Sequence, residues 1–384
     1  MKRYDYLIVG GGIAGASIAS ELGRKSRVCL VEAETRPGLH ATGRSAALFA
    51  PTYGGREIRA LTRASRAFFD QPPVGFSQTP LLTPRGCLYI ARIDQKESIS
   101  IMQEAIQASG GNATRLTKAD ALRNIPQLRS DYVDEALLDA DAMDIDVDAL
   151  HQGFLRTGRN FGVEVLAGAR ITSLARRAGL WETEIAGETV RAHVLVNAAG
   201  AWADEVGAVC GAQRIGLRPL RRTAFLVDPP QGADIGCWPA VIDVDEAFYF
   251  KPDAGKLLLS PADETLVEPG DAQPEELDIA IGADRVQTAL DIEIRRVSHS
   301  WAGLRTFAPD RVPVIGFDPE VDGLFWCAGQ GGYGIQTAPA LARTAAALAL
   351  GESVPTDVAA EGLTAASLSP SRFRSLSPLK AEHA

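Results

Sequence analysis

The order of apolar positions at the start of this chain predicts a strand, a helix and a second strand. Residues 4–9 form a strand-like run that ends in a glycine cluster, residues 13–22 have helical spacing, and residues 28–31 form an apolar run before Glu32. These elements make up the βαβ unit of a dinucleotide-binding domain. The pattern therefore predicts an α/β fold with a Rossmann-like sheet.

The rest of the chain carries both helical and strand-like periodicity. Residues 215–300 alternate between apolar and polar positions, with a hairpin at residues 252–255, so they predict an antiparallel sheet. Helical spacing and apolar runs give the other main elements. We predict helices at 56–69, 97–109, 118–124, 147–160 and 335–350, and strands at 87–91, 194–202 and 324–328.

The first glycine cluster has the spacing of a pyrophosphate-binding turn. Gly10 can form the tight turn, Gly12 lets bare backbone approach a pyrophosphate, and Gly15 lets the helix lie close to the strand. The N-terminus of that helix then faces negative phosphates. Glu32 ends the second strand, where a carboxylate accepts from ribose hydroxyls and repels a 2′-phosphate. The turn favours FAD or NAD over NADP.

Three further segments fit the same cofactor. Residues 36–47 are rich in hydrogen-bond donors and could hold phosphate or the rim of a flavin, although a surface connection has similar composition. The strand at residues 194–202 ends in small residues, Gly200 among them, and would continue the parallel sheet. The turn at residues 329–334 opens a helix, whose N-terminus is a second site for an anion or dipole.

Length and charge narrow the class of protein. A chain of 384 residues is expected to form about two domains. Its net charge of -9 argues against a nucleic-acid partner, which requires a basic face. The longest apolar stretches fall short of a membrane span, and the N-terminus has no signal-peptide pattern. We expect a cytoplasmic protein with no transmembrane segment.

The cysteine and aspartate patterns predict no metal site. The five cysteines form no C-x-x-C pair. The acidic run at residues 139–148 fails as a calcium loop, because Ala149 and Leu155 stand where the loop needs glycine and glutamate. We predict instead that an aspartate of this run caps the helix at 147–160.

With these motifs in place, the chain resembles the D-amino acid oxidase superfamily of FAD enzymes over nearly its whole length, and within it most closely the bacterial D-arginine dehydrogenases. The most specific segments are residues 42–47, 148–153, 194–202, 248–255, 301–305 and 330–337. The resemblance implies a glutathione reductase type FAD domain at 1–80, 146–214 and 303–375, interleaved with an α+β substrate domain at 81–145 and 215–302. The substrate domain would have a mixed, largely antiparallel sheet, the flavin ring would lie where the two domains meet, and residues 376–384 would form a disordered tail.

The resemblance also implies roles for individual residues. Arg222 and Arg305 would bind the substrate carboxylate, Tyr53 and Tyr249 would close over it, and the Gly332 carbonyl would accept from the α-amino group. Leu48, Cys87 and Gln336 would line the substrate pocket. FAD would be bound without a covalent link by Gly10, Gly12, Ile13, Ala14, Gly15, Glu32, Ala33, Thr42, Gly43, Arg44, Ser45, Ala46, Ala199, Gly200, Trp202, Arg305, Gly331, Gly332, Tyr333, Gly334, Ile335 and Gln336.

Two positions depart from the arginine enzymes. Cys87 stands where they have a glutamate for the substrate guanidinium, and Leu48 stands where they have a histidine near the α-amino group. A buried guanidinium without a carboxylate is left unpaired, so basic substrates should be disfavoured. None of the five histidines occupies the matching position, and each is expected to be structural or exposed.

The leading expectation is FAD-dependent oxidative deamination of uncharged D-amino acids. A hydride would pass from the α-carbon to flavin N5, and the imino acid would hydrolyse to a 2-oxo acid and ammonia; the electron acceptor would be a quinone, a carrier or oxygen. An alternative is oxidation of a secondary amine such as proline or sarcosine, of glycine, or of a 2-hydroxy acid. A third is a non-catalytic dinucleotide sensor, which would not require two arginines and two tyrosines in one pocket.

Overall fold

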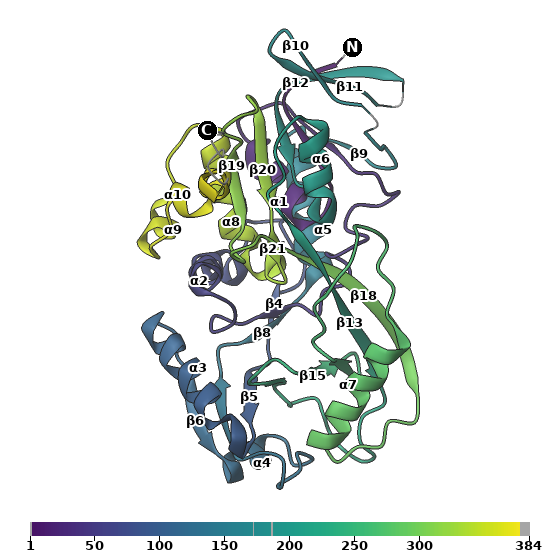
Figure 1. The fold of residues 1–384 in the computed structure, drawn as a ribbon, viewed down its shortest axis with the longest axis vertical. Helices are drawn as coiled ribbons and strands as arrows, with labels where there is room; N and C mark the ends of the chain where they lie inside the picture. The colour runs from purple at the N-terminus through teal and green to yellow at the C-terminus, as the bar shows by residue number, and fades with distance from the viewer. Residues whose placement is uncertain (1, 172, 186, 377–384) are drawn as a thin grey trace, which may run out of the picture. The chain divides into compact units, whose positions relative to one another are not determined.

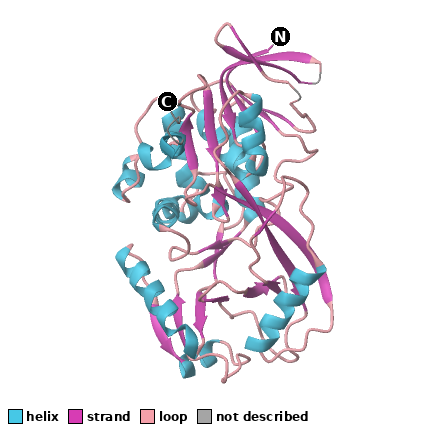
Figure 2. Ribbon diagram, viewed as in Figure 1, coloured by secondary structure: helices cyan, strands magenta, loops and turns pink. Residues whose placement is uncertain are grey.

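The computed structural model describes residues 2–171, 173–185 and 187–376, and they form two compact units. Unit 1 contains residues 2–39, 151–218 and 306–376, and unit 2 contains residues 40–150 and 219–305. Both units combine helices and strands (Figure 2). The predicted fold class is confirmed. Residues 40–80 belong to unit 2, whereas the family resemblance assigned them to the FAD-binding domain. The boundaries of the FAD-binding and substrate-binding domains therefore stay a prediction.

Unit 1 is built on an eight-stranded sheet in the order β10-β11-β12-β1-β2-β9, with β20 paired to β12 and β19 paired to β20. The central pairs β12–β1, β1–β2, β2–β9 and β12–β20 are parallel, so β1 and β20, from the two ends of the chain, flank β12 in one sheet (Figure 1). The strands are β1 (Lys2–Val9), β2 (Val28–Val31), β9 (Glu164–Leu166), β10 (Ala175–Arg177), β11 (Leu180–Ile185), β12 (Glu188–Asn197), β19 (Val314–Phe317) and β20 (Leu324–Ala328).

The helices of unit 1 cover this sheet. Helix α1 contacts β1, β2 and β20, α8 packs along α1 and contacts β19, and α6 contacts β12. Leu7, Leu195 and Trp326 are fully buried in one apolar cluster with residues of α6. The helices are α1 (Ile13–Leu22), α5 (Val147–Asn160, which begins in unit 2), α6 (Ala203–Val209), α8 (Gly334–Ala349), α9 (Thr356–Ala360) and α10 (Ala365–Leu368), with 3-10 turns η2 (Gly200–Trp202) and η3 (Pro370–Leu376).

Unit 2 contains a large mixed sheet in the order β18-β13-β16-β15-β14-β5-β7-β6, in which β14 and β5 are parallel and the other described pairs are antiparallel. A small sheet, β3-β8-β4, accompanies it. The strands are β3 (Leu48–Phe49), β4 (Leu82–Pro84), β5 (Cys87–Ala91), β6 (Thr114–Thr117), β7 (Glu135–Asp139), β8 (Met143–Ile145), β13 (Arg218–Val227), β14 (Ala240–Asp243), β15 (Tyr249–Asp253), β16 (Lys256–Ser260), β17 (Thr265–Leu266) and β18 (Val297–Phe307, whose last two residues pair with β21, Gln330–Gly331, in unit 1).

Strand β5 separates two apolar clusters of unit 2, because its side chains alternate between the faces of the sheet. Leu88 and Ile90 pack in a cluster that includes residues of α4 and α7, and Cys87 and Tyr89 pack in a second cluster with residues of α3. The helices are α2 (Arg56–Asp70), α3 (Lys96–Ala108), α4 (Lys118–Asn124) and α7 (Glu276–Ala289), with the 3-10 turn η1 (Ile93–Gln95).

Local predictions agree closely with these bounds. The predicted aspartate cap is Asp146, whose Oδ1 accepts from Ala149 N at 2.9 Å at the start of α5. The hairpin turn is Ala254–Gly255, with φ of 46° and 78°, which is the left-handed geometry of a two-residue turn. Residues 370–376 form η3, and the predicted disordered tail lies outside the described residues except for Leu376.

Candidate active site

The glycine turn after β1 admits no side chain at two of its positions. Gly10 has a φ of 104°, and a Cβ there would overlap the Ala198 carbonyl oxygen at the end of β12. A Cβ on Gly15 would overlap the Gly10 carbonyl oxygen. Helix α1 therefore lies close to the end of β1, as the sequence predicted, and the turn itself lies against the end of β12. Its N-cap, Gly12, provides no side-chain cap, and its first turn has no acidic residue.

Two side chains hold the middle of this turn. Glu32 Oε2 accepts from Gly11 N at 2.7 Å, and Glu32 Oε1 accepts from Glu34 N at 2.8 Å. His151 Nε2 lies 2.9 Å from the Gly11 carbonyl oxygen, which can only accept, so this nitrogen carries the hydrogen. His151 is buried in α5. It was predicted to be structural or exposed, and its helical spacing with Val147 and Phe154 was the signal that it faces the core.

The start of α8 adjoins the start of α1. A Cβ on Gly334 would lie 3.6 Å from Ile13 Cγ2. Tyr333 is the N-cap of α8 and provides no side-chain cap. Gln336, in the first turn, is buried. Two helix N-termini without side-chain caps therefore converge within unit 1, and their N–H groups and dipoles favour a negatively charged ligand.

The end of β12 lies beside the glycine turn and is the last part of the candidate FAD site in unit 1. Asn197 Nδ2 donates to Ala203 O at 2.7 Å, which ties the strand end to α6. Gly200 has a φ of 56° and begins the turn that contains Trp202. These features fit the pyrophosphate and ribose of FAD: the turn excludes side chains, the helix ends lack caps, and the Glu32 carboxylate keeps acceptor capacity beyond its two backbone bonds.

We expect Glu32→Ala to weaken FAD binding. The carboxylate both accepts from Gly11 N and offers an acceptor for the ribose, so its removal should reduce the binding free energy by about 1 to 3 kcal/mol. The FAD dissociation constant of the reconstituted protein measures this effect. Glu34→Ala is the matched control, because only its backbone N contacts Glu32 in the described bond. An unchanged constant in Glu32→Ala would show that the turn is misread.

In unit 2, the two arginines that are predicted to bind the substrate carboxylate lie close together. Arg222 Nη2 and Arg305 Nη1 lie 3.2 and 3.3 Å from the same atom, Glu264 Oε1. The exposed fraction of the side chain is 9% for Arg222 and 12% for Arg305, against 30% for Glu264. The arginine pair is therefore held in a sheltered position and faces a carboxylate. Sequence reasoning missed Glu264, which has no local signal.

Both predicted tyrosines contact this arginine pair. Arg305 Nη2 donates to Tyr53 OH at 3.3 Å, and the Tyr53 hydroxyl donates to Glu246 Oε2 at 3.3 Å. The Arg222 Cζ atom lies 6.0 Å from the centre of the Tyr249 ring, within the range of a cation–π contact. The structure thus brings together the two arginines and the two tyrosines that the family resemblance places around the substrate carboxylate.

The predicted pocket residues of unit 2 share an apolar cluster. Cys87 is fully buried there, and Leu48, Tyr53 and Tyr249 pack against the cluster. Burial raises the pKa of the Cys87 thiol well above its ordinary value, so the thiol stays neutral. The cluster next to the arginine pair is therefore largely apolar, with the buried Asp139 carboxyl group opposite Cys87.

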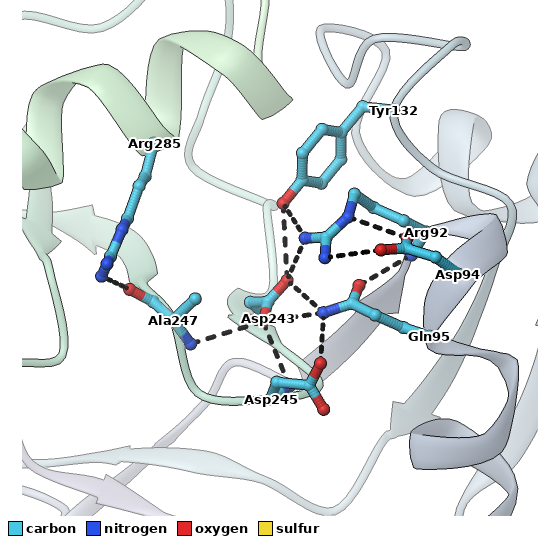
Figure 3. A network of polar contacts seen from close by, with 8 residues as sticks. All are labelled: Arg92, Asp94, Gln95, Tyr132, Asp243, Asp245, Ala247 and Arg285. Atoms are coloured by element: carbon cyan, nitrogen blue, oxygen red, sulfur yellow. Dashed lines mark hydrogen bonds and ion pairs between the residues drawn. The ribbon is translucent and has the colours of Figure 1, made fainter.

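Figure 3 shows a polar network around the buried Asp243, at the turn between β14 and β15. Asp243, with no exposed surface, accepts from Gln95 Nε2 at 3.2 Å and from the backbone N of Asp245 and Ala247. Glu246 has a φ of 56°, which is unusual for a residue other than glycine. The network therefore holds the strained turn whose Glu246 accepts from the Tyr53 hydroxyl, which in turn contacts Arg305.

Most of the donor-rich segment, residues 40–47, belongs to unit 2. Arg44 Nη1 donates to the carbonyl oxygens of Ala272 and Ala302 at 2.8 and 2.9 Å, and its Nη2 pairs with Asp271. The Arg44 guanidinium lowers the pKa of Asp271. These bonds join the segment to β18, and a cofactor contact by Thr42, Gly43, Arg44, Ser45 or Ala46 stays a prediction.

Comparison with known proteins identifies a family whose model spans the residues of the candidate site. The family model described as DAO, FAD dependent oxidoreductase, matches residues 5–348. Hydrogen cyanide synthase subunit HcnC of Pseudomonas aeruginosa is 25% identical, with 93% of this chain and 95% of that protein covered. Glycine oxidase of Bacillus licheniformis is 27% identical with the same coverage. The glycine oxidase structure from Geobacillus kaustophilus has a TM-score of 0.82 at 23% identity, covering 95% of this chain and 99% of that chain.

No helix among the described residues is long and apolar enough to cross a membrane. The relatives support the FAD family and the cofactor. The closer resemblance to D-arginine dehydrogenases stays a prediction.

Proposed function

Because this chain belongs to the DAO family of FAD-dependent oxidoreductases, we propose that it oxidatively deaminates D-amino acids with uncharged side chains. The observation that carries the proposal is the arginine pair of unit 2. Arg222 and Arg305 share a carboxylate oxygen, which is the group that an amino acid would present to them. The apolar cluster with Cys87 and Leu48 is the proposed environment of the side chain.

The arginines bind and orient the substrate. Two guanidinium groups on one carboxylate fix its plane, and the α-carbon then has a single position relative to the protein. FAD, when bound, accepts the hydride that leaves the α-carbon. In this proposal the Gly332 carbonyl accepts from the α-amino group, Tyr53 and Tyr249 cover the carboxylate, and Gln336 lines the pocket.

The amine proton leaves without help from the residue at position 48. Leu48 has no atom that can accept a proton, so water is the proposed acceptor. Loss of one proton and one hydride converts the amino acid to an imino acid. Water then adds to the C=N bond and gives a 2-oxo acid and ammonia.

A second candidate is oxidation of glycine or of a secondary amine such as sarcosine or proline. Its support is the name of two of the relatives, glycine oxidase. Such substrates present the same carboxylate to Arg222 and Arg305, but they leave most of the apolar cluster without a side chain to contact. The two candidates therefore differ in how rate depends on side-chain size.

Anaerobic reduction of the bound flavin tests the proposal without any assumption about the electron acceptor. We expect D-leucine and D-methionine to bleach the visible flavin absorbance faster than glycine, sarcosine or D-arginine, and the L-enantiomers to leave it unchanged. Fastest bleaching by sarcosine or glycine would select the second candidate. Fastest bleaching by a 2-hydroxy acid would reject both.

A further inference from the structure

Glu264 occupies the position between the two guanidinium groups where a substrate carboxylate would bind. Its location is set by the backbone: β17 pairs with β13, so Thr265 lies opposite Arg221, the residue before Arg222. Arg222 Nε also donates to the Asp263 carbonyl oxygen at 2.8 Å. The segment that carries Glu264 is therefore attached to the strand that carries Arg222.

The contacts of Glu264 with the arginines are those of a replaceable ligand. One oxygen serves both guanidinium groups at 3.2 and 3.3 Å, whereas charge-assisted bonds are strongest at about 2.7 to 2.9 Å. The Glu264 side chain is more exposed than either arginine, and the next two residues, Thr265 and Leu266, are exposed. Because the Glu264 side chain is partly exposed to solvent, it can move away from the arginines without disturbing the buried clusters of unit 2.

The charge of the arginine pair favours the presence of an internal carboxylate. Two sheltered guanidinium groups of like charge repel each other, and a negative charge between them offsets that repulsion. An amino acid carboxylate has the same charge and the same two oxygens as the Glu264 side chain. It can therefore take the place of Glu264 between the guanidinium groups when that side chain moves aside.

We propose that Glu264 is a specificity-determining residue that competes with the substrate carboxylate for Arg222 and Arg305, an inference that rests on the proposed function. Glu264 holds the pair in the absence of substrate and is displaced by a monocarboxylate. After displacement it stays on the same short segment and repels a second carboxylate. The site then selects substrates with one carboxylate over dicarboxylates such as D-glutamate.

The test is the binding of 4-methylpentanoate, the analogue of leucine without its amino group, to the FAD-loaded protein by titration calorimetry. In Glu264→Gln the competing charge is gone, and we expect this probe to bind about three- to tenfold more tightly. Glu268→Gln is the matched control, since it removes the same charge from the same exposed stretch, and its affinity should equal that of the wild type. An amine without a carboxylate, 3-methylbutylamine, should show no gain in Glu264→Gln.

A second readout is the ratio of kcat/KM for D-glutamate to that for D-glutamine, which should rise in Glu264→Gln and stay constant in Glu268→Gln. Equal or weaker binding of 4-methylpentanoate by Glu264→Gln would overturn the competing role of Glu264. If the probe also binds Arg222→Lys as well as it binds the wild type, the arginine pair itself is misassigned and the proposed function fails with it. If Arg222→Lys loses binding of the probe while Glu264→Gln shows no gain, only the competing role of Glu264 is overturned and the proposed function stands.

Discussion

Replacement of Arg305 by lysine is expected to lower kcat/KM for the best D-amino acid by roughly 30- to 1,000-fold, which corresponds to about 2 to 4 kcal/mol of transition-state binding. The reason is geometric. Arg305 uses Nη1 toward the carboxylate position, now held by Glu264, and Nη2 toward Tyr53 OH. A single ammonium group cannot reproduce two diverging donors.

Arg222→Lys is expected to act in the same direction. It removes the Nε bond to the Asp263 carbonyl oxygen as well as the Nη2 contact with Glu264. Because binding and orientation of the α-carbon are both affected, KM should rise and kcat should fall in either variant.

The control for these variants is Arg123→Lys on α4, whose side chain is 72% exposed. It should retain the wild-type kcat/KM. Thermal unfolding of each variant separates lost binding from lost stability. An Arg305 or Arg222 lysine variant with wild-type kcat/KM would remove that arginine from substrate binding.

Cys87→Glu is expected to change substrate preference toward D-arginine. A carboxylate at this position could pair with a guanidinium inside a cluster that is otherwise largely apolar. We expect the ratio of kcat/KM for D-arginine to that for D-leucine to rise by at least about tenfold. Cys87→Gln has a similar volume without the charge, so it should leave the ratio near that of the wild type.

The structure adds a stability effect to this prediction. Cys87 lies directly opposite Asp139 in the β5–β7 pair, and opposite residues of an antiparallel pair share a face. Asp139 is already buried, and desolvation raises its pKa. A second carboxyl group there should destabilise the protein without ligand by about 1 to 3 kcal/mol.

D-arginine should offset this loss, because its guanidinium neutralises the added charge. We therefore expect D-arginine to raise the Tm of Cys87→Glu more than that of the wild type. A wild type that already prefers D-arginine, or a variant whose preference does not change, would show that position 87 lies outside the side-chain pocket.

The sequence by itself determined the elements whose signal is local. Helices α4 and α5 and strands β5 and β20 begin and end where periodicity predicted, since a helix or strand face repeats every few residues. The Gly10 turn was also readable, because only glycine tolerates its backbone geometry and close approach. Helix α7 was missed within a region that alternation had assigned to a sheet, and few of its residues are buried.

Only the tertiary structure decided which charged groups meet. Arg222 and Glu264 are brought together by the pairing of β13 with the two-residue strand β17. Arg305 contacts the same oxygen from β18, which is far from β13 along the chain but next to it in the sheet. His151 likewise meets Gly11 across 140 residues. Such contacts depend on the register and packing of elements that are far apart in the chain, and no local spacing of residue types encodes them.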